Sequence, residues 1–387
     1  MHRFKNIRPV IAASLIAASL ITSCSTGGGT EVPPSDTKAP TEIITTATEG
    51  SSATADTSVS ETSESTEETT ESTAEITDPD MTGVPVKKLS SLLIVGDTGY
   101  EYYHFVQSLA DTYVGAINRA GQLLNGKANV YTMIIPTSMD ITLPASVRET
   151  ITNVADQKKA IDYMYGSING VNKVELFDVL RSHRNEYIYF RNDHHWTADG
   201  AWYAYLEFAK LRGRGHASLE NDFTKREFDN FKGSFYRDSD KNKLLNNPDT
   251  VVAYTPNATN KIEIMQKDGT PLEGWHIVTD VSTWASSSKY NTFIGGDQPW
   301  SVITNPAKND GSACLIIKES FGNAFTPFLV PDYQYVYVVD YRYYKKISSL
   351  KLTGVVDKYH IQDVIFCNNI SSTRNKTLMP ALDEFVG

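Results

Sequence analysis

The chain has 387 residues, of which 40% are hydrophobic and 21% are charged, and its net charge is −10 at pH 7. This length is enough for one large domain with an insertion, or for two small domains. The acidic balance argues against a nucleic-acid-binding protein, because such a protein needs a basic face.

The N-terminus has the features of an export signal. Basic residues near the start precede an apolar run that ends at Ile21 and is too short to span a membrane. The sequence Ile21-Thr-Ser-Cys24 resembles the lipobox of bacterial lipoproteins, in which the cysteine becomes the acylated first residue. We therefore expect residues 1–24 to be a lipoprotein signal peptide, and Cys24 to anchor the protein outside the cytoplasm on the bacterial cell membrane. An ordinary cleaved signal peptide is the alternative.

The segment from Ser25 to Asp80 is rich in Ser, Thr and Glu and has almost no large apolar side chains. Its 13 acidic residues and its one basic residue, Lys38, give a net charge of −12, and the first 24 residues carry +3, so residues 81–387 are nearly neutral. Such a segment buries too little apolar surface to offset its chain entropy. We predict a disordered acidic tether over residues 25–80 and a folded domain over residues 81–387.

Short β-branched runs alternate with helical patterns along the domain. Strands are predicted at residues 92–95, 130–135, 187–190, 314–317, 335–339 and 364–367, and helices near residues 102–124, 147–165, 174–184, 200–211 and 324–330. This alternation indicates an α/β fold with a mostly parallel sheet that is covered on both faces. Residues 213–311 are rich in Gly, Asn, Asp, Ser and Lys, and we predict an inserted, β-rich, loop-heavy segment that either shapes a substrate cleft or decorates the periphery.

Polar residues follow several of the predicted strands, at residues 96–98, 193–196, 319–320 and 368–369. Ligands of parallel sheets bind at the carboxyl ends of the strands, so these positions are candidates for a site. Asp193 and His195 are two residues apart, and in extended backbone their side chains lie on the same side. The carboxylate would then hold the Nδ1 proton of the imidazole and leave Nε2 free to act as a base.

Ser320 follows an apolar strand run and precedes a helical pattern that begins near Gly322. A strand, a sharp turn and a helix together expose a nucleophile at a helix N-terminus, where backbone N–H groups favour an oxyanion. A simple helix N-cap is the alternative for a lone serine. The presence of Asp193 and His195, and of Asn368 as an amide donor at the end of a later strand, favours the nucleophile.

The stretch around Asp193-His194-His195-Trp196 resembles the DHHW family of bacterial exported proteins. These proteins are related to the SGNH-hydrolase-like alginate O-acetyltransferase (AlgJ/AlgX-like) proteins, whose motif is Asp-x-His-Trp. The resemblance extends over most of residues 88–387. It implies a three-layer SGNH/flavodoxin-like fold, circularly permuted, because the Asp-x-His block precedes the serine block in the chain.

The resemblance also assigns roles to residues. It implies that Ser320 is the nucleophile, His195 the general base and Asp193 the residue that orients the base. The oxyanion or substrate would be bound by Phe321 through its N–H, by Asn368, Arg342 and Trp196, although packing is the alternative for Trp196. Gly233-Ser234 is similar to a family turn that approaches the cleft. The serine block departs from the family pattern, because Glu319 places a carboxylate beside the nucleophile.

We expect no metal and no cofactor. Adjacent histidines diverge and rarely bind one ion, and no Cys or carboxylate spacing completes a tetrahedral site. His194 is then a bystander. A metal-dependent surface protein is kept as the third hypothesis for function.

The expected function is that of a serine O-acetyltransferase or carbohydrate esterase acting on O-acyl esters, most often acetyl esters, of envelope or exported glycans. An acetyltransferase outside the cell would need a membrane acyltransferase partner to deliver acyl groups. The alternative is a non-catalytic glycan-binding or assembly lipoprotein that keeps the fold, and Glu319 is the feature that favours it.

Overall fold

The structure is a computed structural model that describes residues 78–239 and 241–387. The predicted signal peptide, Cys24 and all of the predicted tether up to residue 77 lie outside the described residues. Asp78, in the last part of the predicted tether, accepts a hydrogen bond from the Ala145 N–H at 2.7 Å and forms an ion pair with Arg184. In the part of the chain that the structure describes, no helix is both long enough and apolar enough to cross a membrane.

A seven-stranded sheet forms the centre of the domain, with the strands in the order β5-β4-β12-β10-β11-β9-β8. The first five of these strands run parallel, whereas β9 and β8 are each antiparallel to the strand before them in this order. The prediction of an α/β fold with a mostly parallel sheet is therefore confirmed. The strands are β5 (Asn172–Val174), β4 (Asn129–Ile135), β12 (Asp363–Asn369), β10 (Ala313–Lys318), β11 (Tyr335–Asp340), β9 (Trp300–Thr304) and β8 (Glu263–Met265).

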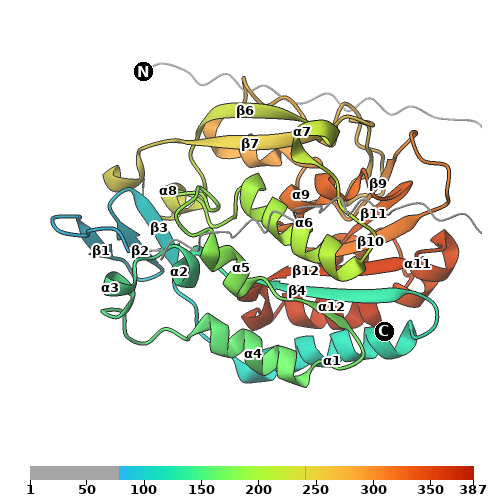
Figure 1. Cartoon of the computed structure of the whole chain (residues 1–387), viewed down its shortest axis with the longest axis horizontal. Helices are drawn as coiled ribbons and strands as arrows, with labels where there is room; N and C mark the ends of the chain where they lie inside the picture. Colours follow the sequence, from blue (N-terminus) through green and yellow to red (C-terminus); the bar gives the residue numbers. More distant parts are fainter. Residues whose placement is uncertain (1–77, 240) are drawn as a thin grey trace, which may run out of the picture. The chain divides into compact units, whose positions relative to one another are not determined.

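The two faces of this sheet carry separate cores. Alternate side chains of β10 point to opposite faces, so that Ile316 belongs to one apolar cluster and Ile317 to the other. Helices α5 (Phe177–Ser182), α6 (Ala198–Arg212) and α9 (Gly322–Phe325) cover the first face; α1 (Gln107–Leu123), α4 (Gln157–Ser167), α11 (Leu352–Tyr359) and α12 (Leu378–Val386) cover the second. Figure 1 shows the sheet between α6 on one side and α1 and α12 on the other.

Two small antiparallel sheets flank the central one. One consists of β1 (Val86–Lys88), β2 (Leu92–Val95) and β3 (Thr98–Glu101), and the other is the pair β6 (Phe223–Phe231) and β7 (Asp249–Pro256). The short helices are α2 (Ser138–Ile141), α3 (Ala145–Arg148), α7 (Leu219–Asp222), α8 (Ser234–Asp238), α10 (Tyr341–Tyr344), η1 (Lys243–Leu245), η2 (Ser286–Thr292), η3 (Thr326–Leu329) and η4 (Ile370–Arg374).

Several expectations about single elements need correction. The predicted strand at residues 187–190 does not form, because no neighbouring strand pairs with it. An isolated bridge joins Tyr189 to Trp196. The apolar pattern that suggested a strand reflects the burial of Ile188 and Phe190 in the core that also contains α6. The predicted strand at residues 92–95 exists as β2 but lies in a small sheet. Within residues 213–311, β8 and β9 extend the central sheet, whereas β6 and β7 form their own pair.

Candidate active site

The candidate site lies at the carboxyl end of β10. The strand ends at Lys318, and residues 319–321 form a tight turn before α9 begins at Gly322. The turn packs closely, since a methyl group added at Gly322 would overlap the Lys318 side chain. Ser320 is therefore held at the edge of the sheet where parallel strands place their ligands.

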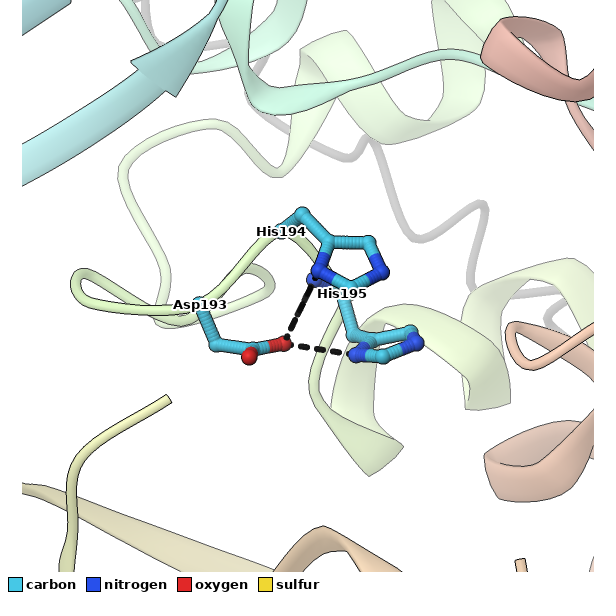
Figure 2. A group of neighbouring side chains, drawn as sticks. All are labelled: Asp193, His194 and His195. Atoms are coloured by element: carbon cyan, nitrogen blue, oxygen red, sulfur yellow. Dashed lines mark hydrogen bonds and ion pairs between the residues drawn. The ribbon is translucent and has the colours of Figure 1, made fainter. Parts of the chain in front are cut away.

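His195 lies between Asp193 and Ser320. Its Nδ1 is 2.6 Å from Asp193 Oδ1, and its Nε2 is 2.8 Å from Ser320 Oγ. Figure 2 shows the Asp193 carboxylate facing the imidazole. The structure thus brings together the three residues predicted as nucleophile, base and orienting acid, although they come from segments 125 residues apart.

The Asp193 carboxylate is fixed by backbone donors as well as by the imidazole. Oδ1 accepts the His195 N–H at 3.0 Å, and Oδ2 accepts the Ser234 N–H at 2.7 Å. Gly233 lies directly against the carboxylate, where any side chain would overlap Asp193. Burial alone would raise the pKa of Asp193, but both neighbouring histidines and these hydrogen bonds hold it well below its usual value. Asp193 is therefore ionised at neutral pH.

His195 is buried and neutral. Burial, together with the nearby His194, lowers the pKa of His195 to about 4, and the attraction of Asp193 only partly opposes this. The Tyr290 ring stacks on the imidazole with centroids 3.9 Å apart and planes 10° apart. The Tyr290 hydroxyl donates to the Ser320 carbonyl at 3.1 Å. A neutral imidazole with its Nε2 at the serine hydroxyl is the form that a general base requires.

Glu319 is buried beside Ser320. Its Oε2 accepts from Ser320 Oγ at 3.2 Å and from the Phe321 N–H at 3.3 Å, while its Oε1 accepts the Asn369 N–H at 2.9 Å. Burial raises the pKa of Glu319, although Arg342 and the two N–H donors act against that rise. The carboxylate therefore points towards the site and accepts hydrogen bonds from the Ser320 hydroxyl and the Phe321 N–H.

A cavity of about 720 Å³ opens over the serine. Its walls come from the small sheet of β1 to β3, the α8 turn, the serine turn and the η4–α12 segment. Hydroxyl, amide and charged groups dominate the lining, which comprises Ser90, Ser91, Leu92, Glu101, Tyr102, His104, His194, Ser234, Phe235, Arg237, Asp238, Glu319, Ser320, Phe321, Arg342, Asn369, Ser371, Ser372, Arg374, Asn375 and Leu378.

Comparison with known proteins places the chain in a family. The sequence profile of the family described as DHHW protein matches residues 52–339, which is most of the chain and includes both Asp193 and Ser320. The chain belongs to the DHHW family. No curated protein matches its sequence.

Of the three solved structures described next, the first two share the fold of this chain. A DHHW family protein from Eubacterium siraeum matches with a TM-score of 0.69 at 26% identity, over 77% of this chain and 97% of that one. The structure of Bacillus cereus PatB1 with a sulfonyl adduct matches with a TM-score of 0.60 at 17% identity, over 80% of this chain and 100% of PatB1. The O-acetyltransferase domain of Pseudomonas putida AlgJ matches with a TM-score of 0.36 at 14% identity, over 78% of this chain and 99% of that one.

The other two residues of the DHHW motif are placed differently from Asp193 and His195. Trp196 is fully buried, and its Nε1 donates to the Phe321 carbonyl at 2.9 Å, so it connects the motif to the serine turn and does not line the cavity. His194 lines the cavity and its Nδ1 lies 2.7 Å from Ser234 Oγ.

Asp193, His194 and His195 offer one possible ligand atom each within 4.8 Å of one another. Each of these groups already has a hydrogen-bond partner, because His195 contacts Asp193 and Ser320, and His194 contacts Ser234. A metal ion here would have to break the contacts that orient the base. The donor set fits proton transfer better than metal binding.

The residues predicted to bind an oxyanion are only partly brought to the serine. Phe321 lines the cavity, but its N–H is bonded to Glu319. Arg342 lines the cavity as well and is held by Asp340 and Asp297. Asn368 is fully buried with its Nδ2 donating to the Tyr341 hydroxyl at 3.3 Å, and Asn369 lines the cavity in its place, because neighbouring residues of β12 point to opposite faces.

Sequence reasoning did not find several residues that shape the site. Tyr290, which stacks on the base, and Asp297, which lies 2.9 Å from Arg342 and 3.5 Å from Lys318, come from the loop-rich segment 213–311. No local pattern marks either residue. One feature of the sequence could have indicated Asp297: Lys318 ends an apolar strand run, and a lysine buried there needs acidic partners. In the structure these partners are Asp297 and Asp340.

Proposed function

We propose that this DHHW family protein is a serine-dependent enzyme that transfers or hydrolyses O-acyl groups. The observation that carries the proposal is the continuous hydrogen-bond chain from Asp193 through His195 to Ser320, with distances of 2.6 and 2.8 Å. A neutral base, an ionised acid that orients it and a hydroxyl at a strand-to-helix turn are the parts of a covalent acyl-transfer mechanism.

The reaction begins when Ser320 Oγ attacks the carbonyl carbon of an acyl ester while His195 Nε2 takes the hydroxyl proton. The tetrahedral intermediate collapses, the ester C–O bond breaks, and His195 returns the proton to the leaving alcohol. This leaves an acyl group on Ser320. An acceptor hydroxyl then attacks the acyl-enzyme with His195 again removing a proton, and Ser320 is regenerated.

The identity of the acceptor decides between the two activities. A sugar hydroxyl gives an O-acetyltransferase, and water gives an esterase. The cavity supports a glycan, because hydroxyl, amide and charged side chains make up most of its lining and the aromatic residue Tyr102 lies among them. Most charged side chains of the cavity form ion pairs with other residues of the protein. Glu101, for example, is 2.8 Å from Arg374.

Three further features belong to the proposal. If the parallel strands are numbered 1 to 5 in the sequence β10, β11, β12, β4, β5, they lie in the sheet in the order 2-1-3-4-5 of flavodoxin-like folds. This order supports a circularly permuted SGNH-like fold.

Export and a lipid on Cys24 would hold the domain at the cell membrane, where envelope glycans are in reach. A membrane acyltransferase would then be the partner that supplies acyl groups.

The test is hydrolysis of an activated acetyl ester by the purified protein. We expect Ser320→Ala and His195→Ala each to lower turnover by at least about 10³-fold while the thermal unfolding temperature stays within a few degrees. Because PatB1 has been solved with a sulfonyl adduct, a sulfonyl fluoride should add one sulfonyl group to Ser320, detected by peptide mass. Equal turnover in the wild type and both variants would sink the proposal.

A non-catalytic glycan-binding protein is the second candidate, and Glu319 is the observation that favours it. A carboxylate that occupies the Phe321 N–H at 3.3 Å removes a donor that an oxyanion would need. This candidate predicts that glycans bind the cavity with equal affinity in the wild type and in Ser320→Ala, and that no sulfonyl group is added.

A further inference from the structure

Glu319 lies where a reacting carbonyl oxygen would have to find its donors. One of its oxygens is within 3.3 Å of both the nucleophile Oγ and the Phe321 N–H, and the other is fixed by the Asn369 N–H at 2.9 Å. The side chain is only 6% exposed. It belongs to the turn that carries Ser320, between β10 and α9.

The protonation state of this carboxyl decides what it does to the reaction. An ionised carboxylate only accepts hydrogen bonds, so it holds the Phe321 N–H, attracts the Ser320 hydroxyl proton away from His195 and repels an oxyanion. A protonated carboxyl carries an O–H donor. It then releases the serine proton to His195 Nε2 at 2.8 Å and can donate to the developing oxyanion.

We propose that Glu319 is a catalytic residue that works as a neutral acid: its protonated form donates to the oxyanion, and its ionised form switches the site off. The inference rests on the proposed acyl-transfer function and adds to it a residue that sets when the site is active. The active form combines a protonated Glu319 with a neutral His195.

The surroundings of Glu319 favour the neutral acid. Burial is the largest influence on its pKa and raises it, and Asp297 raises it further, whereas Arg342 and the Asn369 and Phe321 N–H groups lower it. The charge of Arg342 is largely committed elsewhere, because its guanidinium lies 2.6 Å from Asp340 and 2.9 Å from Asp297. Glu319 also interacts with Tyr290, Tyr341 and Cys367, whose raised pKa values keep them uncharged at neutral pH. The buried ammonium of Lys318, the preceding residue, is paired with Asp340 at 3.2 Å and Asp297 at 3.5 Å.

These two residues define a pH window. The pKa of His195 is lowered to about 4, so the base is neutral above that pH. The pKa of Glu319 is raised, so its acid form persists upwards from its ordinary value. Activity should therefore rise as pH increases through about 4 and fall at higher pH as Glu319 ionises, by about tenfold for each pH unit beyond its pKa.

The experiment compares pH profiles of kcat for ester hydrolysis between pH 4 and 9 in the full-length protein. The wild type should lose activity towards alkaline pH. Glu319→Gln, whose amide stays neutral and can donate, should give a flat profile above about pH 5 and exceed the wild type at the alkaline end of the range. The matched control is Glu384→Gln on α12, a carboxylate paired with Lys345 on the surface, which should keep the wild-type profile.

The outcomes separate the inference from the function on which it rests. A wild-type profile that stays level or rises all the way to pH 9 overturns the role of Glu319, whereas a loss of turnover in Ser320→Ala still shows that the reaction uses Ser320. If Glu319→Gln does not fold, Glu319→Ala serves, because it frees the Phe321 N–H and should also flatten the profile. A wild type no more active than Ser320→Ala at any pH overturns both proposals.

Discussion

The two halves of the candidate site differ in how completely their polar atoms are satisfied. On the acid–base side, formed by Asp193, His195, Gly233 and Ser234, the carboxylate meets an imidazole and two backbone N–H groups. On the nucleophile side, formed by Glu319, Ser320 and Phe321, two donors share one carboxylate oxygen at 3.2 and 3.3 Å. The contacts of the first half fit an ionised Asp193. In the second half, protonation of Glu319 would turn a hydrogen-bond acceptor into a donor.

In the proposed mechanism, this difference gives the two halves separate tasks. The acid–base side is rigid, because Gly233 lies against Asp193 and Tyr290 lies flat on His195. The contact with Asp193 favours the tautomer of His195 that carries its proton on Nδ1. The nucleophile side then determines whether that base has a productive partner. Changes to the first half should alter the rate, and changes to Glu319 should alter its dependence on pH.

The sharpest test of the acid–base side is Asp193→Asn. The amide can no longer hold the proton on His195 Nδ1, so the wrong tautomer faces Ser320, and we expect kcat to fall by about 10⁴-fold. The shape of the pH profile set by Glu319 should remain. Asp199→Asn is the control. Asp199 lies in the first turn of α6 and accepts a hydrogen bond from the Tyr254 hydroxyl, so this variant should leave kcat unchanged.

A second substitution breaks the rigidity without removing any functional group. Gly233→Ala places a methyl group where the Asp193 carboxylate lies, so the carboxylate must move. A displacement of about 1 Å near the reacting groups costs about 10²-fold in kcat. In Gly166→Ala, an exposed helical position with open space, kcat should not change and stability should rise by roughly 0.5–1 kcal/mol, measured by urea unfolding. Equal kcat in both variants would contradict the role of Gly233.

The sequence predicted those parts of the site that depend on neighbouring residues, and missed those that depend on contacts between distant segments. Asp193 and His195 share a tripeptide, and Ser320 follows a strand run and precedes a helix, so local patterns indicated all three. Asn368 was predicted to contact the oxyanion or substrate, but in the structure Asn369 lines the cavity and Asn368 is buried. The choice between neighbouring residues of β12 depends on which face of the sheet the strand shows to the cavity, and a one-residue shift exchanges the two.

The fold shows the same division. The parallel strands and their helices were predictable, since β-branched runs and helical periods are local properties. An apolar run does not determine which sheet it joins, so β2 was assigned to the wrong sheet, and β9 and the edge strand β8 were not expected in the main sheet. Tyr290 and Asp297 were missed because a loop-rich segment carries no periodicity that places a side chain in space.

A third prediction concerns the contact between the two halves. Trp196→Phe keeps a ring in the core but removes the donor to the Phe321 carbonyl, which is left buried without it. We expect a loss of about 1–3 kcal/mol in the free energy of unfolding. We also expect roughly tenfold lower kcat, because the serine turn is then held less firmly against the base. The half-buried Trp202, changed to Phe, is the control and should alter stability more than kcat.

The smallest effect is expected for Tyr290→Phe. The ring still stacks on His195, but the hydroxyl that donates to the Ser320 carbonyl at 3.1 Å is lost. One neutral hydrogen bond contributes about 1 kcal/mol, so kcat should fall by no more than about fivefold. A fall as large as that of Asp193→Asn would mean that the hydroxyl takes part in the chemistry, and would contradict the distinction drawn between the two halves.

The separation of His195 and Ser320 along the chain has a consequence for how the protein could be followed during folding. Their contact spans 125 residues and closes only when β10, the segment around residues 190–196 and the Tyr290 loop have all docked. Contacts between residues so far apart in the chain are slow to form, because the intervening loop must first be closed. Ser320 should be nucleophilic only in molecules that have finished folding. A serine-reactive label would then count native molecules in a mixed population, and its rate of uptake during refolding would time the last step of assembly.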